Sequence, residues 1–186
     1  MSDREKRLTR FLVTVKSQIV KRRYPCTDIT FAPCGYKSKE ALPTDFTSFE
    51  KGMRWGEKKD SHCLFNLKFS LPESERDSSI RLRVDTDKDG WNVYNPQFII
   101  YENGKALQGL DTNHRTVEID YKQEYNYLLY ASTGSLVDNL PLNVEAEIYD
   151  ADTKALYYDL LVPFEICKIS DAVLSIFICW RYSRSN

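Results

Sequence analysis

Regular alternation of apolar and polar residues dominates the middle of the chain and predicts β-strands. Residues 62–71 have an apolar side chain at every second position, which is typical of a strand with one buried face. The same period recurs from Ile80 to Val84. Further strands are predicted at residues 98–102, 105–108, 117–119, 125–132, 142–149 and 155–162. Many strands separated by turns, with no helices between them, favour a mainly β antiparallel sandwich or jelly roll.

The segment 95–119 is the best-defined part of this pattern. It reads as strand, tight turn, strand, polar loop and strand, with Asn103-Gly104 at the turn. Asn-Gly between two alternating stretches is the strongest short-range signal for a β-hairpin. The segment has no plausible catalytic set of side chains, so we expect a scaffold or recognition domain rather than a complete enzyme.

An amphipathic helix is predicted from Ser2 to about Arg22, ending before Pro25. Ser2 and Glu5 have the S-x-x-E spacing of a capping box, which satisfies free N–H groups at a helix start. Apolar residues recur at the spacing of one buried helix face: Leu8, Phe11, Leu12, Val15 and Ile19. This helix is therefore expected to pack on a sheet or on a partner.

The remaining segments have weaker patterns. Residues 26–60 are expected to be an irregular but ordered loop that carries Trp55, with at most a short strand. A short second helix is predicted from Asp171 to Trp180, with Ser170 or Asp171 as its cap. The expected parts are an N-terminal helix (1–24), a sandwich domain (25–169) and a C-terminal helix or tail (170–186).

Composition and charge exclude several classes of protein. The 26 basic and 27 acidic residues give a net charge of -1, so no basic field indicates nucleic acid. The sequence contains no apolar run long enough to span a membrane and no signal peptide. The 5 cysteines include no C-x-x-C pair. We expect reduced thiols in a cytoplasmic protein.

The acidic turn after residue 84 is a weak candidate for a calcium site. Asp85, Asp87 and Asp89 match the front half of a calcium-binding loop, where alternate carboxylates converge on the cation. Such a loop closes with a glutamate, and Pro96 occupies that position. A polar turn is the favoured alternative.

Two aromatic residues after this turn are candidates for sugar binding. Trp91 and Tyr94 could stack on the apolar face of a sugar ring, since flat aromatic surfaces bury apolar groups well. The favoured alternative is that most aromatic residues fill the core.

The polar loop after residue 107 is a candidate contact site. It carries Gln108, Asp111, Asn113 and His114. The favoured interpretation is local hydrogen bonding, in which Asp111 or Asn113 caps backbone N–H groups and holds the imidazole. The alternative is contact with a ligand or with a neighbouring domain.

The central segment resembles a known family. It resembles the N-terminal β-sandwich domain of glycoside hydrolase family 38 α-mannosidases, in the branch with cytosolic eukaryotic and bacterial enzymes. The similar residues are Asn95-Pro96-Gln97, Tyr101, Asn103-Gly104, Gln108-Gly109-Leu110-Asp111 and Asn113-His114. The resemblance implies a jelly-roll sandwich like that of galactose-binding domains.

The resemblance also implies where the chemistry of such an enzyme lies. Family members are retaining, metal-dependent enzymes whose zinc ligands and aspartate nucleophile belong to a separate downstream barrel domain. None of those motifs can be placed on this chain, so it carries no catalytic residue and no cofactor; the parent enzyme would use zinc or another divalent metal. The implied role is a truncated, non-catalytic accessory domain that packs on the catalytic domain of the same polypeptide.

Alternatives to this role remain open. The chain could be a free-standing carbohydrate-binding module for mannose-containing glycans, or a protein-interaction module that forms a homo-oligomer. In the accessory role, the loop Gln108 to His114 is expected to face a neighbouring domain.

Overall fold

The structure is a computed structural model that describes residues 3–36, 43–87, 96–135 and 139–182, with the backbone alone for 171–182. The chain divides into two compact units. The helical unit comprises Met1–Lys21 and Tyr149–Asn186, and the sandwich unit comprises Arg22–Ile148. Each unit has its own apolar core.

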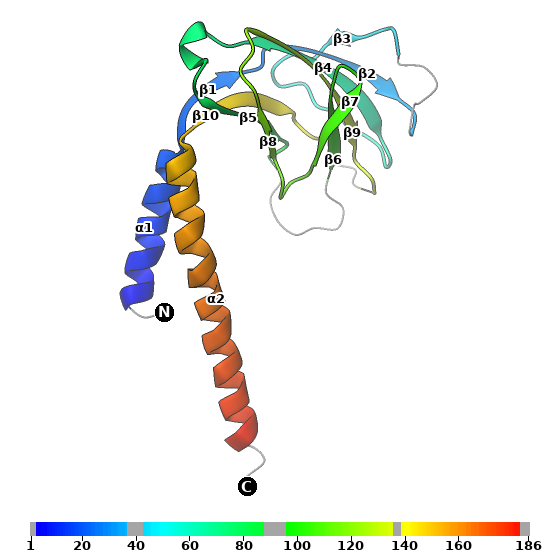
Figure 1. The fold of residues 1–186 in the computed structure, drawn as a ribbon. Helices are drawn as coiled ribbons and strands as arrows, with labels where there is room; N and C mark the ends of the chain where they lie inside the picture. The colour runs from blue at the N-terminus through cyan, green and yellow to red at the C-terminus, as the bar shows by residue number, and fades with distance from the viewer. Residues whose placement is uncertain (1–2, 37–42, 88–95, 136–138, 183–186) are drawn as a thin grey trace. The chain divides into compact units, whose positions relative to one another are not determined.

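Strands make up most of the sandwich unit (Figure 1). In chain order the elements are α1 (Asp3–Ile19), β1 (Val20–Pro25), β2 (Asp28–Cys34), β3 (Thr47–Ser48), β4 (His62–Ser70), the 3-10 helix η1 (Glu73–Glu75), β5 (Ser79–Asp85), β6 (Gln97–Glu102), β7 (Lys105–Leu110), β8 (Thr116–Ile119), β9 (Glu124–Ser132), β10 (Asn143–Tyr149) and α2 (Ala151–Tyr182).

The strands form two sheets with apolar side chains between them. One sheet has the order β1-β10-β5-β8 and the other β3-β2-β4-β9-β6-β7. The pairings described for the second sheet, and that of β5 with β8, are antiparallel. The fold is therefore mainly β, an antiparallel sandwich whose chain begins with one helix and continues into another after the last strand, and the prediction of this fold class is confirmed.

The centre of the core lies on β4 and β9. These strands pair over their full length, which places Phe65 opposite Leu129 and Leu67 opposite Tyr127. All four side chains are at most 1% exposed. Because side chains alternate between the two faces of a strand, a register shift of one residue would move this set to the opposite face. The apolar pattern therefore fixes the register.

The predicted hairpin is present between β6 and β7. Asn103 and Gly104 both have positive φ, 49° and 76°, and Glu102 pairs with Lys105 across the turn. Two consecutive left-handed residues define the type I′ turn whose twist matches that of paired strands. The exposed strand that follows, β7, forms one edge of its sheet.

The N-terminal helix is shorter than predicted, because α1 ends at Ile19 and the chain continues as β1. In the strand β1, two polar side chains bind the same buried acid. Arg22 and Tyr24 bind the carboxylate of Glu75, at distances of 2.7–2.8 Å for Arg22 and 2.7 Å for the Tyr24 hydroxyl. Residues 1–2 lie outside the described residues, so the capping box at Ser2 is untested.

The expectation of an irregular segment at 26–60 is wrong for β2. All seven residues of β2 pair with β4, from Asp28 opposite Lys68 to Cys34 opposite His62. Pro33 argues against a strand in the sequence. Only Thr30 and Phe31 of β2 pair with β3, and Pro33 lies beyond them. Its missing N–H therefore removes none of the described hydrogen bonds between β2 and β3. Trp55 is 2% exposed and its backbone bonds Leu140.

The predicted strand at 155–162 and the separate helix from Asp171 are also wrong, because α2 is one continuous helix. Asp150 caps its start, with Oδ1 accepting the Thr153 N–H at 2.8 Å. Apolar residues at helical spacing on α2 pack with α1: Tyr157, Leu160, Leu161 and Phe164. A continuous apolar run fits a strand or a helix, and α1 provides the surface that favours the helix.

The apolar face of α1 is mostly as predicted. Leu12, Val15 and Ile19 are buried, and Leu8 packs on the same cluster. Phe11 is 50% exposed, so it lies beside this face rather than within it.

Glu75 is a buried acid that ties η1 to β1. Its side chain is 2% exposed and accepts hydrogen bonds from Arg22, Tyr24 and Ser78. These partners, Arg22 above all, outweigh the opposing effect of burial and lower the pKa of Glu75 to about 2. The charged carboxylate is therefore the form that stabilises the fold.

We expect Glu75→Gln to lower the free energy of unfolding at pH 7 by about 1–2 kcal/mol, because the amide replaces charge-assisted hydrogen bonds. Since the folded pKa lies below the unfolded value of about 4.3, the contribution is complete above that pH and is lost as the pH falls toward 2. Urea unfolding from pH 7 to pH 2 should show the two proteins converging. A constant difference across this range would contradict the account.

Candidate functional site

The polar loop between β7 and β8 is organised by Asp111. One oxygen of its carboxylate, Oδ1, accepts the backbone N–H groups of Asn113 and His114, each at 2.7 Å, and lies 3.2 Å from Nδ1 of the imidazole. Burial opposes the charged form, but the two backbone N–H groups and the imidazole of His114 together outweigh burial and lower the pKa of Asp111. The predicted local hydrogen bonding is thus confirmed.

The loop presents polar groups to solvent. The His114 side chain is 76% exposed, although Asp111 holds its ring nitrogen. The Gln108 side chain donates a hydrogen bond of 3.1 Å from Nε2 to the backbone oxygen of Thr116, the first residue of β8. Asp111, Asn113 and His114 therefore lie on one ordered turn, and Gln108, near the end of β7, links that strand to β8.

Arg115, which no pattern in the sequence indicated, joins this loop to the end of β5. Its Nε donates to the backbone oxygen of Thr112 at 2.7 Å. Its Nη1 lies 3.1 and 2.9 Å from the two carboxylate oxygens of Asp85. Both ion-pair partners are about 85% buried, with side chains 15% and 16% exposed. Two candidate sites that are separate in the sequence thus form one surface.

The calcium candidate has a different environment from the one a cation needs. Asp85 binds Arg83 and Arg115 and accepts the Asp87 N–H at 2.9 Å. Burial would raise its pKa, but this N–H and the two guanidinium groups outweigh burial and lower it. A calcium ion would have to compete with two arginines for this carboxylate. Asp89, the third candidate ligand, lies outside the described residues.

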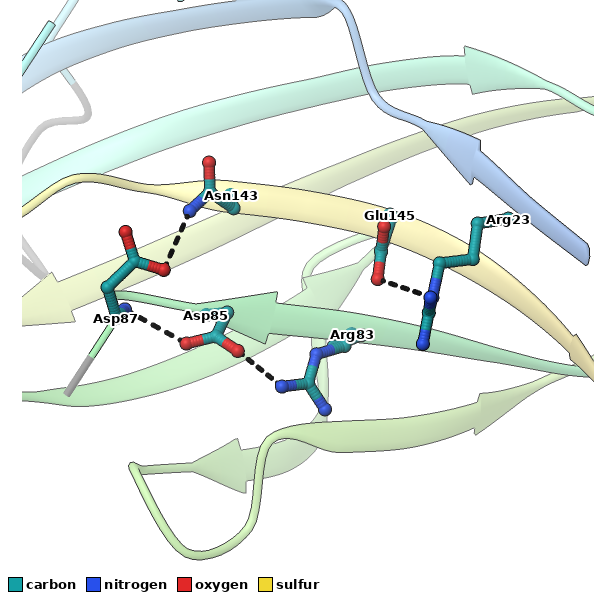
Figure 2. A pocket seen from close by; sticks show the side chains of 6 residues that line it. All are labelled: Arg23, Arg83, Asp85, Asp87, Asn143 and Glu145. Atoms are coloured by element: carbon teal, nitrogen blue, oxygen red, sulfur yellow. Dashed lines mark hydrogen bonds and ion pairs between the residues drawn. The ribbon is translucent and has the colours of Figure 1, made fainter. Parts of the chain in front are cut away.

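A polar hollow of about 360 Å³ lies beside Asp85 on the outer face of the four-stranded sheet. Three adjacent strands and the turn after β5 supply its lining: Arg23 from β1, Asn143 and Glu145 from β10, Arg83 and Asp85 from β5, and Asp87 from the turn. Figure 2 shows these side chains facing one another across the strands. Asn143 Nδ2 donates to Asp87 at 3.3 Å, and Arg23 lies 3.1 Å from Glu145.

A buried ion pair lies next to this hollow. Glu147 is 1% exposed, and Arg81 binds it at 2.7 Å through Nε and 2.6 Å through Nη2. Arg23 contacts both Glu147 and Glu145. Burial raises the pKa of Glu145; Arg23 opposes this change and Glu147 reinforces it. The outer face of the four-stranded sheet is therefore an alternating array of charges.

Other candidates are untested or concern different residue types. Trp91 and Tyr94 lie outside the described residues, so sugar stacking on them is untested. Four of the cysteines are free thiols in the structure: Cys26, Cys34, Cys63 and Cys167. In the part of the chain that the structure describes, no group of three or more His, Cys, Asp or Glu could hold a metal ion. Within the same residues, no helix combines the length and apolar character needed to cross a membrane.

No protein-family model matches the chain, and no curated protein matches its sequence. The solved structures with some similarity include β-glucuronidases. An uncultured Clostridium enzyme is 14% identical with a TM-score of 0.46, covering 70% of this chain and 30% of its own. The Ruminococcus gnavus enzyme with D-glucaro 1,5-lactone is 12% identical (TM-score 0.47), covering 71% and 30%. The Bacteroides uniformis enzyme is 13% identical (TM-score 0.46), covering 68% and 18%.

This chain thus spans less than a third of each of these proteins. At such identities and TM-scores the similarity supports no conclusion about activity. The family 38 relationship indicated by the central segment stays a prediction.

We expect Arg115→Ala to lower the free energy of unfolding by roughly 2–3 kcal/mol, because it leaves the partly buried Asp85 with one cationic partner fewer. The matched control is Arg76→Ala, which breaks the ion pair between Arg76 and Glu73. The side chain of Arg76 is 62% exposed and that of Glu73 is 65% exposed. Exposed pairs contribute about 0–1 kcal/mol. Urea unfolding checks both variants, and equal losses would contradict the role assigned to Arg115.

Proposed function

We propose that this chain is a non-catalytic accessory domain of a glycoside hydrolase, and specifically of a family 38-like α-mannosidase. In this role the sandwich unit supports a catalytic domain elsewhere in the same polypeptide. That catalytic domain would carry the zinc or other divalent metal, and the protein would be cytoplasmic.

The observation that carries the proposal is the ordered loop at Asp111–His114. Residues that resemble the family in sequence, including Gln108 and Asp111, are the ones that build this turn and fix its position on β8. An exposed loop held by its own carboxylate loses little conformational entropy when it meets a partner. Such a loop is well suited to contact a neighbouring domain.

The helical unit supplies a second surface suited to protein contact. Four large apolar residues of α2 are 50–64% exposed: Tyr158, Val162, Ile166 and Ile169. Their spacing of four, four and three residues places them on one helix face. Contiguous apolar surface of this kind is typical of protein interaction sites. This stripe favours an accessory or interaction domain, including the homo-oligomeric alternative.

The 186-residue chain by itself is expected to release no nitrophenol from a nitrophenyl α-mannoside, with or without added zinc. If the reading frame continues past Asn186 into a domain with His and Asp metal ligands, the longer protein should hydrolyse this substrate. His114→Ala in the longer protein should lower kcat by disturbing the contact, whereas the control Asn126→Ala, on exposed β9 surface, should not. Zinc-stimulated hydrolysis by the 186-residue chain would refute the proposal.

The stripe on α2 predicts self-association of the isolated chain. Light scattering should show a mass above that of a monomer, and Val162→Glu with Ile166→Glu should restore a monomer by placing charge on the stripe. Leu156→Glu is the matched control, since Leu156 is 48% exposed but lies off this face. A monomeric wild-type chain at high concentration would count against the stripe as an interaction surface.

A further inference from the structure

The polar hollow on the outer face of the four-stranded sheet alternates hydrogen-bond donors and acceptors. Arg23 and Arg83 provide guanidinium donors, and Glu145 and Asp87 provide carboxylate acceptors. Asn143 adds an amide, which offers both. Neighbouring strands lie about 4.8 Å apart, so these groups recur at a spacing that a small ring with several polar substituents can bridge.

The charges of the lining disfavour an anionic ligand. Two guanidinium groups face three carboxylates among the lining residues, Asp85, Asp87 and Glu145, and each guanidinium is already paired with one of them. A phosphate or carboxylate would have to displace an internal carboxylate to form bidentate contacts with arginine.

The same pairing disfavours a metal cation. Asp85 is bound by Arg83 and Arg115, and the backbone N–H of Asp87 occupies another acceptor position. Asp87 accepts the amide of Asn143. A hard cation needs six or more oxygen ligands whose charge is not already compensated.

A neutral ligand with several hydroxyl groups fits this lining. Each hydroxyl donates one hydrogen bond and accepts others, so adjacent hydroxyls can use a carboxylate and a guanidinium at the same time. The hollow of about 360 Å³ lies within the size range of small-molecule sites. We propose that the hollow between β1, β10 and β5 binds a neutral polyhydroxylated ligand of the saccharide class.

The affinity of the hollow for such a ligand depends on how far its polar groups are held in place and on how open it is to water. The ion pairs of Arg23 with Glu145 and of Arg83 with Asp85 hold the polar groups in place before the ligand arrives, which lowers the entropic cost of binding. The hollow is open to water on one side and its described lining includes no aromatic residue. We therefore expect weak binding, with a Kd of about 1 mM or higher.

This site goes beyond the accessory role proposed above, which assigns no ligand to the sandwich unit. Absence of sugar binding would leave the accessory role intact, and loss of the accessory role would leave the sugar site intact.

The test is a titration of the isotope-labelled 186-residue chain with methyl α-mannopyranoside, followed by amide chemical shifts in NMR spectra. Saturable shifts are expected at β5 and β10, near Asp85, Asn143 and Glu145. Asn143→Ala and Glu145→Gln should each weaken binding by roughly five-fold, the loss of about one hydrogen bond. Asn126→Ala, an exposed asparagine on a strand of the other sheet, is the matched control and should leave the Kd unchanged.

Salt dependence and two charged probes complete the test. Binding of the neutral mannoside should not change between low and high salt, since screening acts on charged ligands. Sodium glucuronate and calcium chloride should bind more weakly than the mannoside. The proposal is overturned if no saturable shifts occur up to about 100 mM mannoside, if Asn143→Ala and Glu145→Gln bind as the wild type does, or if either charged probe binds more tightly.

Discussion

The alternating pleat of β5 is the constraint on which both the core and the candidate site depend. Leu82 and Val84 point inward and are at most 2% exposed. Arg81, Arg83 and Asp85 consequently occupy the opposite face, because successive side chains of a strand point to opposite sides. The residues that bury the strand therefore also fix the direction of its charges. A shift of one residue would bury three charged groups and expose the core.

The carboxylates on the outer face of the four-stranded sheet are held in ion pairs, because they are largely buried and need cationic partners. Glu147 and Asp85 each bind two arginines, and a carboxylate this inaccessible to water would destabilise the fold without such partners. Pairing across β1, β10 and β5 ties these strands together from outside the core. Arg115 extends the array to the β7–β8 loop, so the ordered turn and the polar hollow belong to one surface.

Sequence patterns predicted the strands well where burial is one-sided. Alternation of apolar and polar residues predicted β4, β5 and β9, and Asn103-Gly104 predicted the hairpin between β6 and β7. Both signals depend only on neighbouring residues and each is typical of a single backbone geometry. The loop at Asp111 was likewise predictable, since an aspartate caps N–H groups two and three residues ahead. Two segments were predicted wrongly. Pro33 argued against the strand β2, and the apolar run in α2 fits the period of a strand as well as that of a helix until the partner helix α1 is known.

The central site could not be predicted for a different reason. Arg115 and Asp85 lie 30 residues apart, and only the pairing of β5 with β8 brings them together. The hollow similarly needs three strands from distant parts of the chain. Nothing in the spacing of Arg23, Asp85 and Glu145 indicates that they share a surface.

The most direct test of this account is hydrogen exchange at the junction between the loop and β5. If Arg115 joins them, the amide hydrogens of Asn113 and His114 should exchange slowly, and Arg115→Ala should accelerate both together with that of Val84, which donates to the Arg115 backbone oxygen. Loop amides that exchange as fast as those of an unfolded chain in the wild type would contradict the central claim that loop and sheet form one ordered surface.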